Sequence, residues 1–137
     1  MNLHSDWLVP DWQVPGVGAV MTTRRGGASA APFDSMSLHG ALGDDPQAVD
    51  ANQASLAQAT GAQPIYLNQV HGARVVRLSR ADLAPDATPL MADASVTTEP
   101  GIACAVQVAD CLPVLLAAPG GSAVGAGTSA ARRTAGP

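Results

Sequence analysis

The chain has 137 residues, of which 47% are apolar and 13% charged, a balance typical of one globular domain with a hydrophobic core. Its net charge of −4 argues against nucleic acid as a partner, because phosphate binding needs a basic surface. No apolar run approaches the roughly 20 residues of a membrane-spanning helix, so we expect no association with a membrane.

The N-terminal residues and the two cysteines favour a cytoplasmic protein. His4, Asp6 and Asp11 interrupt the first residues, which therefore lack the charged-then-apolar order of a signal peptide. Cys104 falls inside a predicted strand and Cys111 just beyond its end, so we expect no disulfide between them. Unpaired thiols are typical of a reducing compartment.

The first half of the chain predicts a strand, a turn, a loop and a helix. Val17–Thr23 predicts the strand, and Arg24–Gly27 predicts a turn with positive backbone angles. The two arginines of this turn either hold an anion or are simply solvated. Residues 28–43 predict the loop and residues 46–60 the helix. The helix signals are Asp44 or Asp45 as the N-cap, Pro46 in the first position, the stripe Val49, Asn52, Leu56 and Ala59, and Gly61 as the stop.

The second half predicts a series of short strands. They fall at residues 64–67, 74–78 and 92–97, with an irregular connector over residues 79–92. Gly101–Ala117 predicts two buried strands hinged at Ala109–Cys111. Several strands with one well-marked helix predict the α/β class, with the helix covering a sheet.

Two places carry residues that packing explains poorly. His71 closes an apolar run within Gln69–Gly72, and Asp110 and Cys111 stand side by side at the predicted hinge. We expect His71 and Cys111 to meet in space. Such a pair can be a nucleophile and its base, or part of a zinc site, since thiolate and imidazole are preferred zinc ligands. Alternatively, the thiol is simply buried and the histidine belongs to an unrelated loop.

An ordered series of short motifs resembles the laccase-domain (YfiH-like) family, long described as multicopper polyphenol oxidases. The motifs are Arg24-x-Gly-Gly, Pro32-Phe-Asp-Ser35, Gly43-Asp-Asp-Pro46, Gln69-Val-His-Gly72, Ala92-Asp-Ala94, Pro100-Gly101 and Ala109-Asp-Cys-Leu-Pro-Val114. Each motif is weak alone, but the ordered series is specific. The resemblance runs from about Pro10 to about Gly127.

This resemblance implies a cytoplasmic, layered α/β sandwich with a mixed β-sheet, covering helices and one zinc ion. It implies purine nucleosides and phosphate as substrates, with phosphorolysis of nucleosides and of methylthioadenosine, and also deamination of adenosine. Editing of peptidoglycan precursors and polyphenol oxidation are further activities attached to the family. We rank copper chemistry last, because two cysteines and three histidines are too few for a multicopper cluster.

Carried over by position, His71 and Cys111 match two of the family's three zinc ligands. The third is a histidine, and Thr128 stands in its place. The resemblance also suggests Arg24 and Arg132 for phosphate contact. Asp110 is expected to orient a ligand or to act as an acid or base.

The expected domain is therefore a single, incomplete laccase domain over residues 1–137, with the C-terminal half of the family fold missing. Residues 128–137 have low complexity and suggest an aberrant tail, such as a frameshift in GC-rich DNA would produce. With Thr128 in place of an imidazole, we expect weakened zinc binding and impaired activity. A non-catalytic remnant or a binding module is the alternative.

Overall fold

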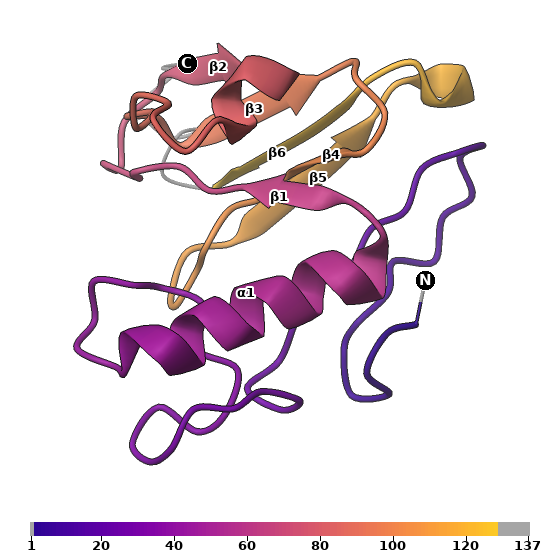
Figure 1. Ribbon diagram of the computed structural model, residues 1–137. Coiled ribbons are helices and arrows are strands. Elements are labelled where there is room, and N and C mark those ends of the chain that lie inside the picture. The colour runs from indigo at the N-terminus through magenta and orange to yellow at the C-terminus, as the bar shows by residue number, and fades with distance from the viewer. Residues whose placement is uncertain (1, 129–137) are drawn as a thin grey trace. The chain divides into compact units, whose positions relative to one another are not determined.

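The computed structural model describes residues 2–128 and divides the chain into two compact units (Figure 1). Unit 1 contains residues 1–12 and 18–61, and unit 2 contains residues 13–17 and 62–137. In the described range, no helix is long and apolar enough to cross a membrane. The single domain expected over residues 1–137 stays a prediction.

Unit 1 is built around one helix, α1, which spans Pro46–Thr60. Asp45 caps it, because its side chain accepts a hydrogen bond from the backbone N–H of Gln47 at 3.0 Å. Gly61 ends the helix in the left-handed conformation at φ 72°, which a residue without Cβ adopts at little cost. The predicted helix and both of its boundaries are confirmed.

The core of unit 1 combines the N-terminal segment, the loop and the helix. Trp7, Met36 and Leu56 are buried together. Asn52, on the same helix, is 1% exposed and binds the loop in four hydrogen bonds. Its side chain accepts from the N–H of Ala28 and donates to the Ser29 hydroxyl and to the carbonyls of Ser35 and Ser37. The loop expected over residues 28–43 is confirmed, and one buried amide organises much of it.

The strand predicted at Val17–Thr23 is wrong. That segment makes a single antiparallel bridge, between Met21 and Leu8. Pro10 follows Leu8 by two residues and has no N–H to donate, so the ladder cannot extend from Met21 towards Val17 along that partner. The turn after it is confirmed in part, since Gly26 has φ 95°.

Unit 2 contains two β-sheets, whose strands lie side by side in Figure 1. In the smaller sheet, β1 (Gln63–Ile65) pairs in parallel with β4 (Ile102–Cys104). The larger sheet has the order β2-β3-β6-β5, and its bounds are β2 Val75–Arg77, β3 Ala94–Thr97, β6 Val124–Thr128 and β5 Pro113–Ala117. β2 and β3 are parallel, whereas β6 is antiparallel to both of its neighbours.

The α/β class with a mixed sheet is confirmed. The expected packing of the helix on a sheet stays a prediction, because α1 and the sheets belong to different units. Unit 2 has its own core, and two short 3-10 helices, η1 (Arg80–Leu83) and η2 (Pro119–Gly121), lie in its connections. The buried members of that core are Ile65, Leu67, Val76, Leu78, Ala92 and Ile102.

The central stretch Gly101–Ala117 differs from the prediction in two ways. Its strands are separated by eight residues, 105–112, rather than by a hinge at Ala109–Cys111. β4 and β5 belong to different sheets, so the chain needs a connector that crosses from one sheet to the other. The strands are also less buried than expected, because β5 pairs only with β6 and leaves Leu116 62% exposed.

Candidate functional site

His71 lies in an exposed loop of unit 2 with a constrained backbone. Its φ of 58° is uncommon for a residue with a side chain, and such a conformation persists only where the surroundings hold it. The holding group is the carboxylate of Asp93, which is 0% exposed. It accepts hydrogen bonds from the backbone N–H groups of Val70 at 3.0 Å, His71 at 2.8 Å and Gly72 at 2.7 Å.

Cys111 lies in the connector between β4 and β5 as a free, half-buried thiol. Asp110 beside it is exposed to solvent. The second thiol, Cys104, packs against the core of unit 2 and donates to the carbonyl of Val124 at 3.8 Å. Burial raises the pKa of the Cys104 thiol. Cys111 is therefore the thiol better placed to bind a ligand.

A pair of glutamines joins the loop of His71 to the connector of Cys111. The side chain of Gln69 donates to the carbonyl of Gln107 at 2.8 Å and accepts from the N–H of the same residue at 2.7 Å. Gln69 precedes His71 by two residues, and Gln107 precedes Cys111 by four. The two segments that carry the candidate ligands are thus tied to each other. The meeting of His71 and Cys111 themselves stays a prediction.

Thr128, the last residue of β6, lies close to both segments in the fold. Its backbone N–H donates to the carbonyl of Asp93 at 3.2 Å, and it is in register with Pro113 of β5. Its side chain is 3% exposed, and its hydroxyl has no hydrogen-bond partner in the described part of the chain. The position that the resemblance gives to a third ligand is therefore buried, polar and unsatisfied.

A zinc ion would find two suitable donors in unit 2. Imidazole and thiolate are preferred zinc ligands, and His71 and Cys111 supply one of each. Across residues 2–128, no group of three or more His, Cys, Asp or Glu side chains is arranged to hold a metal ion. The donor set matches zinc in kind but falls short by one ligand.

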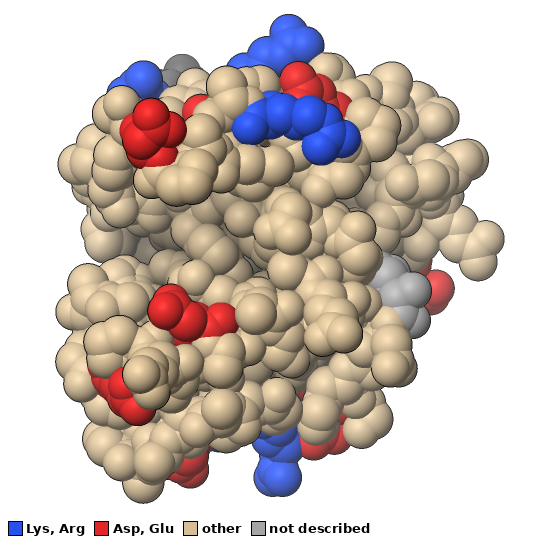
Figure 2. Space-filling model, viewed as in Figure 1, with Lys and Arg blue, Asp and Glu red and all other residues tan. Residues whose placement is uncertain are grey.

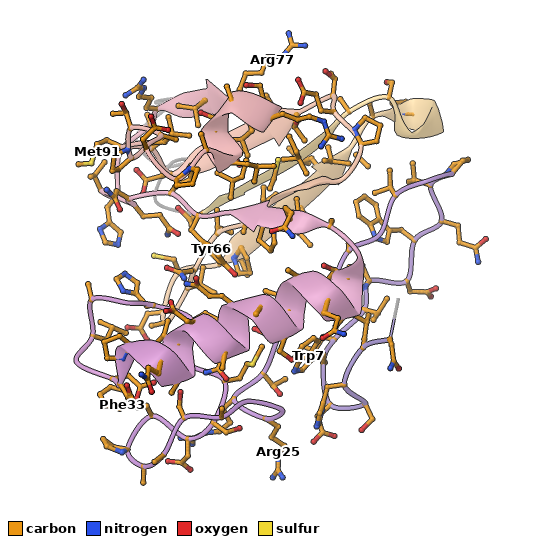
Figure 3. All side chains as sticks on the ribbon, viewed as in Figure 1. Trp7, Arg25, Phe33, Tyr66, Arg77 and Met91 are labelled. Carbon is orange, nitrogen blue, oxygen red and sulfur yellow. The ribbon has the colours of Figure 1, made fainter. Side chains whose placement is uncertain are left out.

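The arginines expected to contact phosphate have structural partners or fall outside the described range. Arg24 belongs to unit 1, and its guanidinium donates to the carbonyl of Asp34 at 3.0 Å. Arg25 projects from the same unit and forms an exposed ion pair with Asp6 at 3.5 Å (Figure 3). Arg132 lies outside the described residues. The phosphate roles of Arg24 and Arg132 stay predictions.

The charged side chains show no single concentration on the face drawn in Figure 2. Each blue arginine group on that face has red acidic atoms near it. A mixed surface of this kind attracts polyanions weakly. An anion site on this face would therefore depend on local geometry rather than on a broad basic surface.

Sequence reasoning missed the residues that hold the site together. Asp93 appears in the sequence only as the middle of Ala92-Asp-Ala94, and Gln69 and Gln107 carry no obvious signal. A carboxylate among small residues at the start of a predicted strand is the one clue to Asp93. Such a group needs several donors to be tolerated in the interior.

Comparison with known proteins places the chain in a family. Residues 18–132 match the family described as multi-copper polyphenol oxidoreductase laccase. The chain belongs to this family.

Among curated relatives, purine nucleoside phosphorylase PA4543 of Pseudomonas aeruginosa is 45% identical over 121 residues, which are 88% of this chain and 48% of that protein. Purine nucleoside phosphorylase YfiH of Escherichia coli (strain K12) is 42% identical over 125 residues, which are 89% of this chain and 50% of that protein. The chain spans about half the length of the curated relatives that it matches.

Two solved structures have the same fold over most of the chain. The Neisseria meningitidis protein NMB0706 matches with a TM-score of 0.81 and 38% identity, covering 96% of this chain and 56% of that one. YlmD from Geobacillus stearothermophilus matches with a TM-score of 0.78 and 29% identity, covering 88% of this chain and 48% of that one. The architecture of the two units is therefore that of a known fold.

Proposed function

We propose that this chain carries part of a zinc-dependent purine nucleoside phosphorylase site, with His71 and Cys111 as metal ligands and with activity limited by Thr128. The observation that carries the proposal is that hydrogen bonds join three segments of unit 2. The loop of His71 is tied to the connector of Cys111 through Gln69, and Asp93 contacts both that loop and Thr128. The relatives named purine nucleoside phosphorylases supply the substrate class.

The chemistry at such a site divides between the metal and the protein. A zinc ion held there would supply Lewis-acid catalysis. The protein's own part is to orient the imidazole and the thiolate and to bind nucleoside and phosphate. Asp110 is exposed next to Cys111, which suits a group that exchanges protons with a substrate or orients a ligand. Arg24 and Arg132 are proposed for the phosphate, and deamination of adenosine and phosphorolysis of methylthioadenosine are proposed as companion activities.

Zinc is a better proposal than copper, although the family's description names copper. A multicopper centre needs many imidazoles, and the whole chain has only three histidines. His39 and His4 belong to unit 1 and accept hydrogen bonds from backbone N–H groups close by in the sequence. This leaves His71 as the histidine that accompanies a thiol in unit 2.

The test is zinc content together with release of purine base from inosine and phosphate. We expect substoichiometric zinc and weak, phosphate-dependent base release, both lost in His71→Ala and in Cys111→Ser. His39→Ala and Cys104→Ala are matched controls, which remove the same functional groups elsewhere and should retain zinc. If the chain binds no zinc and releases no base even at high enzyme concentration, the non-catalytic alternative replaces this proposal.

A further inference from the structure

Asp93 combines features that no packing role requires together. It is fully buried, and both oxygens of its side chain accept from consecutive backbone N–H groups. Three such donors are enough to compensate a buried carboxylate, and hydrogen bonds to a charged acceptor are stronger than neutral ones. The consecutive N–H groups belong to Val70, His71 and Gly72. The carboxylate therefore holds the backbone conformation of the candidate ligand His71 and of its two neighbours.

The backbone of Asp93 extends this control to a second part of the site. Its carbonyl accepts from the N–H of Thr128, and its own N–H donates to the carbonyl of Arg74. Arg74 lies three residues after His71, so both ends of the His71 loop are held by the same residue. Thr128 occupies the position expected for the third ligand. Asp93 therefore links two of the three positions where ligands are expected.

We infer that Asp93 is a positioning residue, which fixes the imidazole of His71 for metal binding by holding the loop in its left-handed conformation. This inference rests on the proposed zinc site. Because φ of 58° is unfavourable for a histidine, the free loop would relax to other conformations if the acceptor were removed. A relaxed loop would present the imidazole in many orientations, and each departure from the ligating one weakens binding.

The first measurement is amide hydrogen exchange in the metal-free chain. Asp93→Asn keeps the shape of the side chain but replaces one acceptor oxygen by an NH₂ group that cannot accept. We expect faster exchange at the amides of 70–72 in this variant. Thr97→Val is the matched control: Thr97 is 2% exposed and hydrogen-bonded in β3, but it has no contact with the loop among its hydrogen bonds. It should lower stability without changing exchange in the loop.

The second measurement is zinc affinity, read by competition with a chromophoric chelator, in a Thr128→His background that supplies a third imidazole. Substitutions of groups that orient a metal ligand typically weaken binding by about 10–100-fold, and we expect a loss in this range for Asp93→Asn. The zinc affinity of Thr97→Val should stay within about twofold of that of its parent when both are fully folded, because Thr97 does not orient a ligand. Asp93→Glu, which retains the charge, should recover part of the affinity.

The outcomes separate the inference from the proposed function. Unchanged exchange at 70–72 in Asp93→Asn overturns the inference, and so does accelerated exchange with unchanged zinc affinity. If neither the parent nor Thr128→His binds zinc, the proposed metal site fails, and with it the claim that Asp93 serves a metal. In that case accelerated exchange would leave Asp93 as a structural clamp only.

Discussion

The backbone N–H of Thr128 donates to the carbonyl of Asp93 at 3.2 Å, while the hydroxyl of the same threonine is buried without a partner in the described residues. The main chain of β6 thus ends beside the residue that holds the loop of His71. Thr128 is also in register with Pro113, two residues after Cys111. In the proposed zinc site, Thr128 stands at the position of the third ligand, and its hydroxyl is not one of the side-chain groups that zinc prefers.

Thr128→His should therefore strengthen zinc binding. An imidazole at this position would complete the three-ligand pattern of a catalytic zinc site. We expect the affinity to rise by at least about tenfold, equivalent to ~1.4 kcal/mol. Chelator competition measures this directly, and base release from inosine should increase in parallel.

Thr128→Val is the matched control for that experiment. It has nearly the shape of threonine and removes the unpaired hydroxyl, so we expect no gain in zinc affinity and a gain in unfolding free energy of about 1 kcal/mol. An equal rise in zinc affinity in both variants would show that stability alone, rather than a new ligand, had improved binding.

Gln69→Leu should loosen the connector that carries Cys111. The substitution removes both hydrogen bonds between Gln69 and Gln107. The backbone groups of Gln107 lose these partners, so we expect the unfolding free energy to fall by roughly 1–3 kcal/mol. Limited proteolysis should cut the 105–112 connector faster in this variant.

Gln58→Leu provides the comparison, because Gln58 is an exposed residue of α1 and makes no such link. It should change the unfolding free energy by less than about 0.5 kcal/mol. Equal cleavage rates at the connector in both variants would contradict a tying role for Gln69.

Asn52→Ala should be among the most destabilising substitutions in unit 1. The side chain of Asn52 makes four hydrogen bonds to the 28–37 loop, and its loss leaves several buried groups without partners, so we expect a cost of about 3 kcal/mol or more. Gln53→Ala, on the same helix, removes one hydrogen bond to the carbonyl of Leu38 and should cost about 1 kcal/mol. Urea titration of both variants checks the order, and a Gln53→Ala cost equal to that of Asn52→Ala would contradict it.

Local signals predicted the structure well where the determining contacts are close in sequence. Helix α1 begins at Pro46 behind its Asp45 cap and stops at Gly61 as its sequence indicates, because a cap acts through residues within one turn. The short strands β2 and β3 also fall inside their predicted ranges. The α/β class followed from the same local patterns.

Long-range pairing explains what the sequence did not reveal. An apolar run such as Val17–Thr23 becomes a strand only if a partner offers donors and acceptors along its length, and the partner contains Pro10. The separation of β4 from β5 depends on their pairing with β1 and β6, which lie far away in the sequence. Asp93 acts on residues more than twenty positions before it, so no local pattern announces its role.

The two thiols should differ in their rates of alkylation. Burial raises the pKa of Cys104 above its ordinary value of 9.0, so less thiolate forms there at a given pH. We expect iodoacetamide to label Cys111 faster than Cys104 at pH 8, because Cys104 is packed against the core and burial disfavours its thiolate. Peptide mass spectrometry after short labelling times measures both rates, and zinc should slow labelling of Cys111 but not of Cys104.

The same pKa shift predicts a change in stability with pH. A thiol whose pKa is higher in the folded than in the unfolded chain contributes stability that is fully present below the unfolded value. That contribution is lost as the pH rises through the folded value. Stability should therefore fall above pH 9.0 in the parent, and Cys104→Ala should remove the part of this fall that the thiol causes. Thermal melts at pH 8 and pH 10 test the difference between the two proteins. An identical alkaline loss in both would show that burial of Cys104 does not disfavour its thiolate.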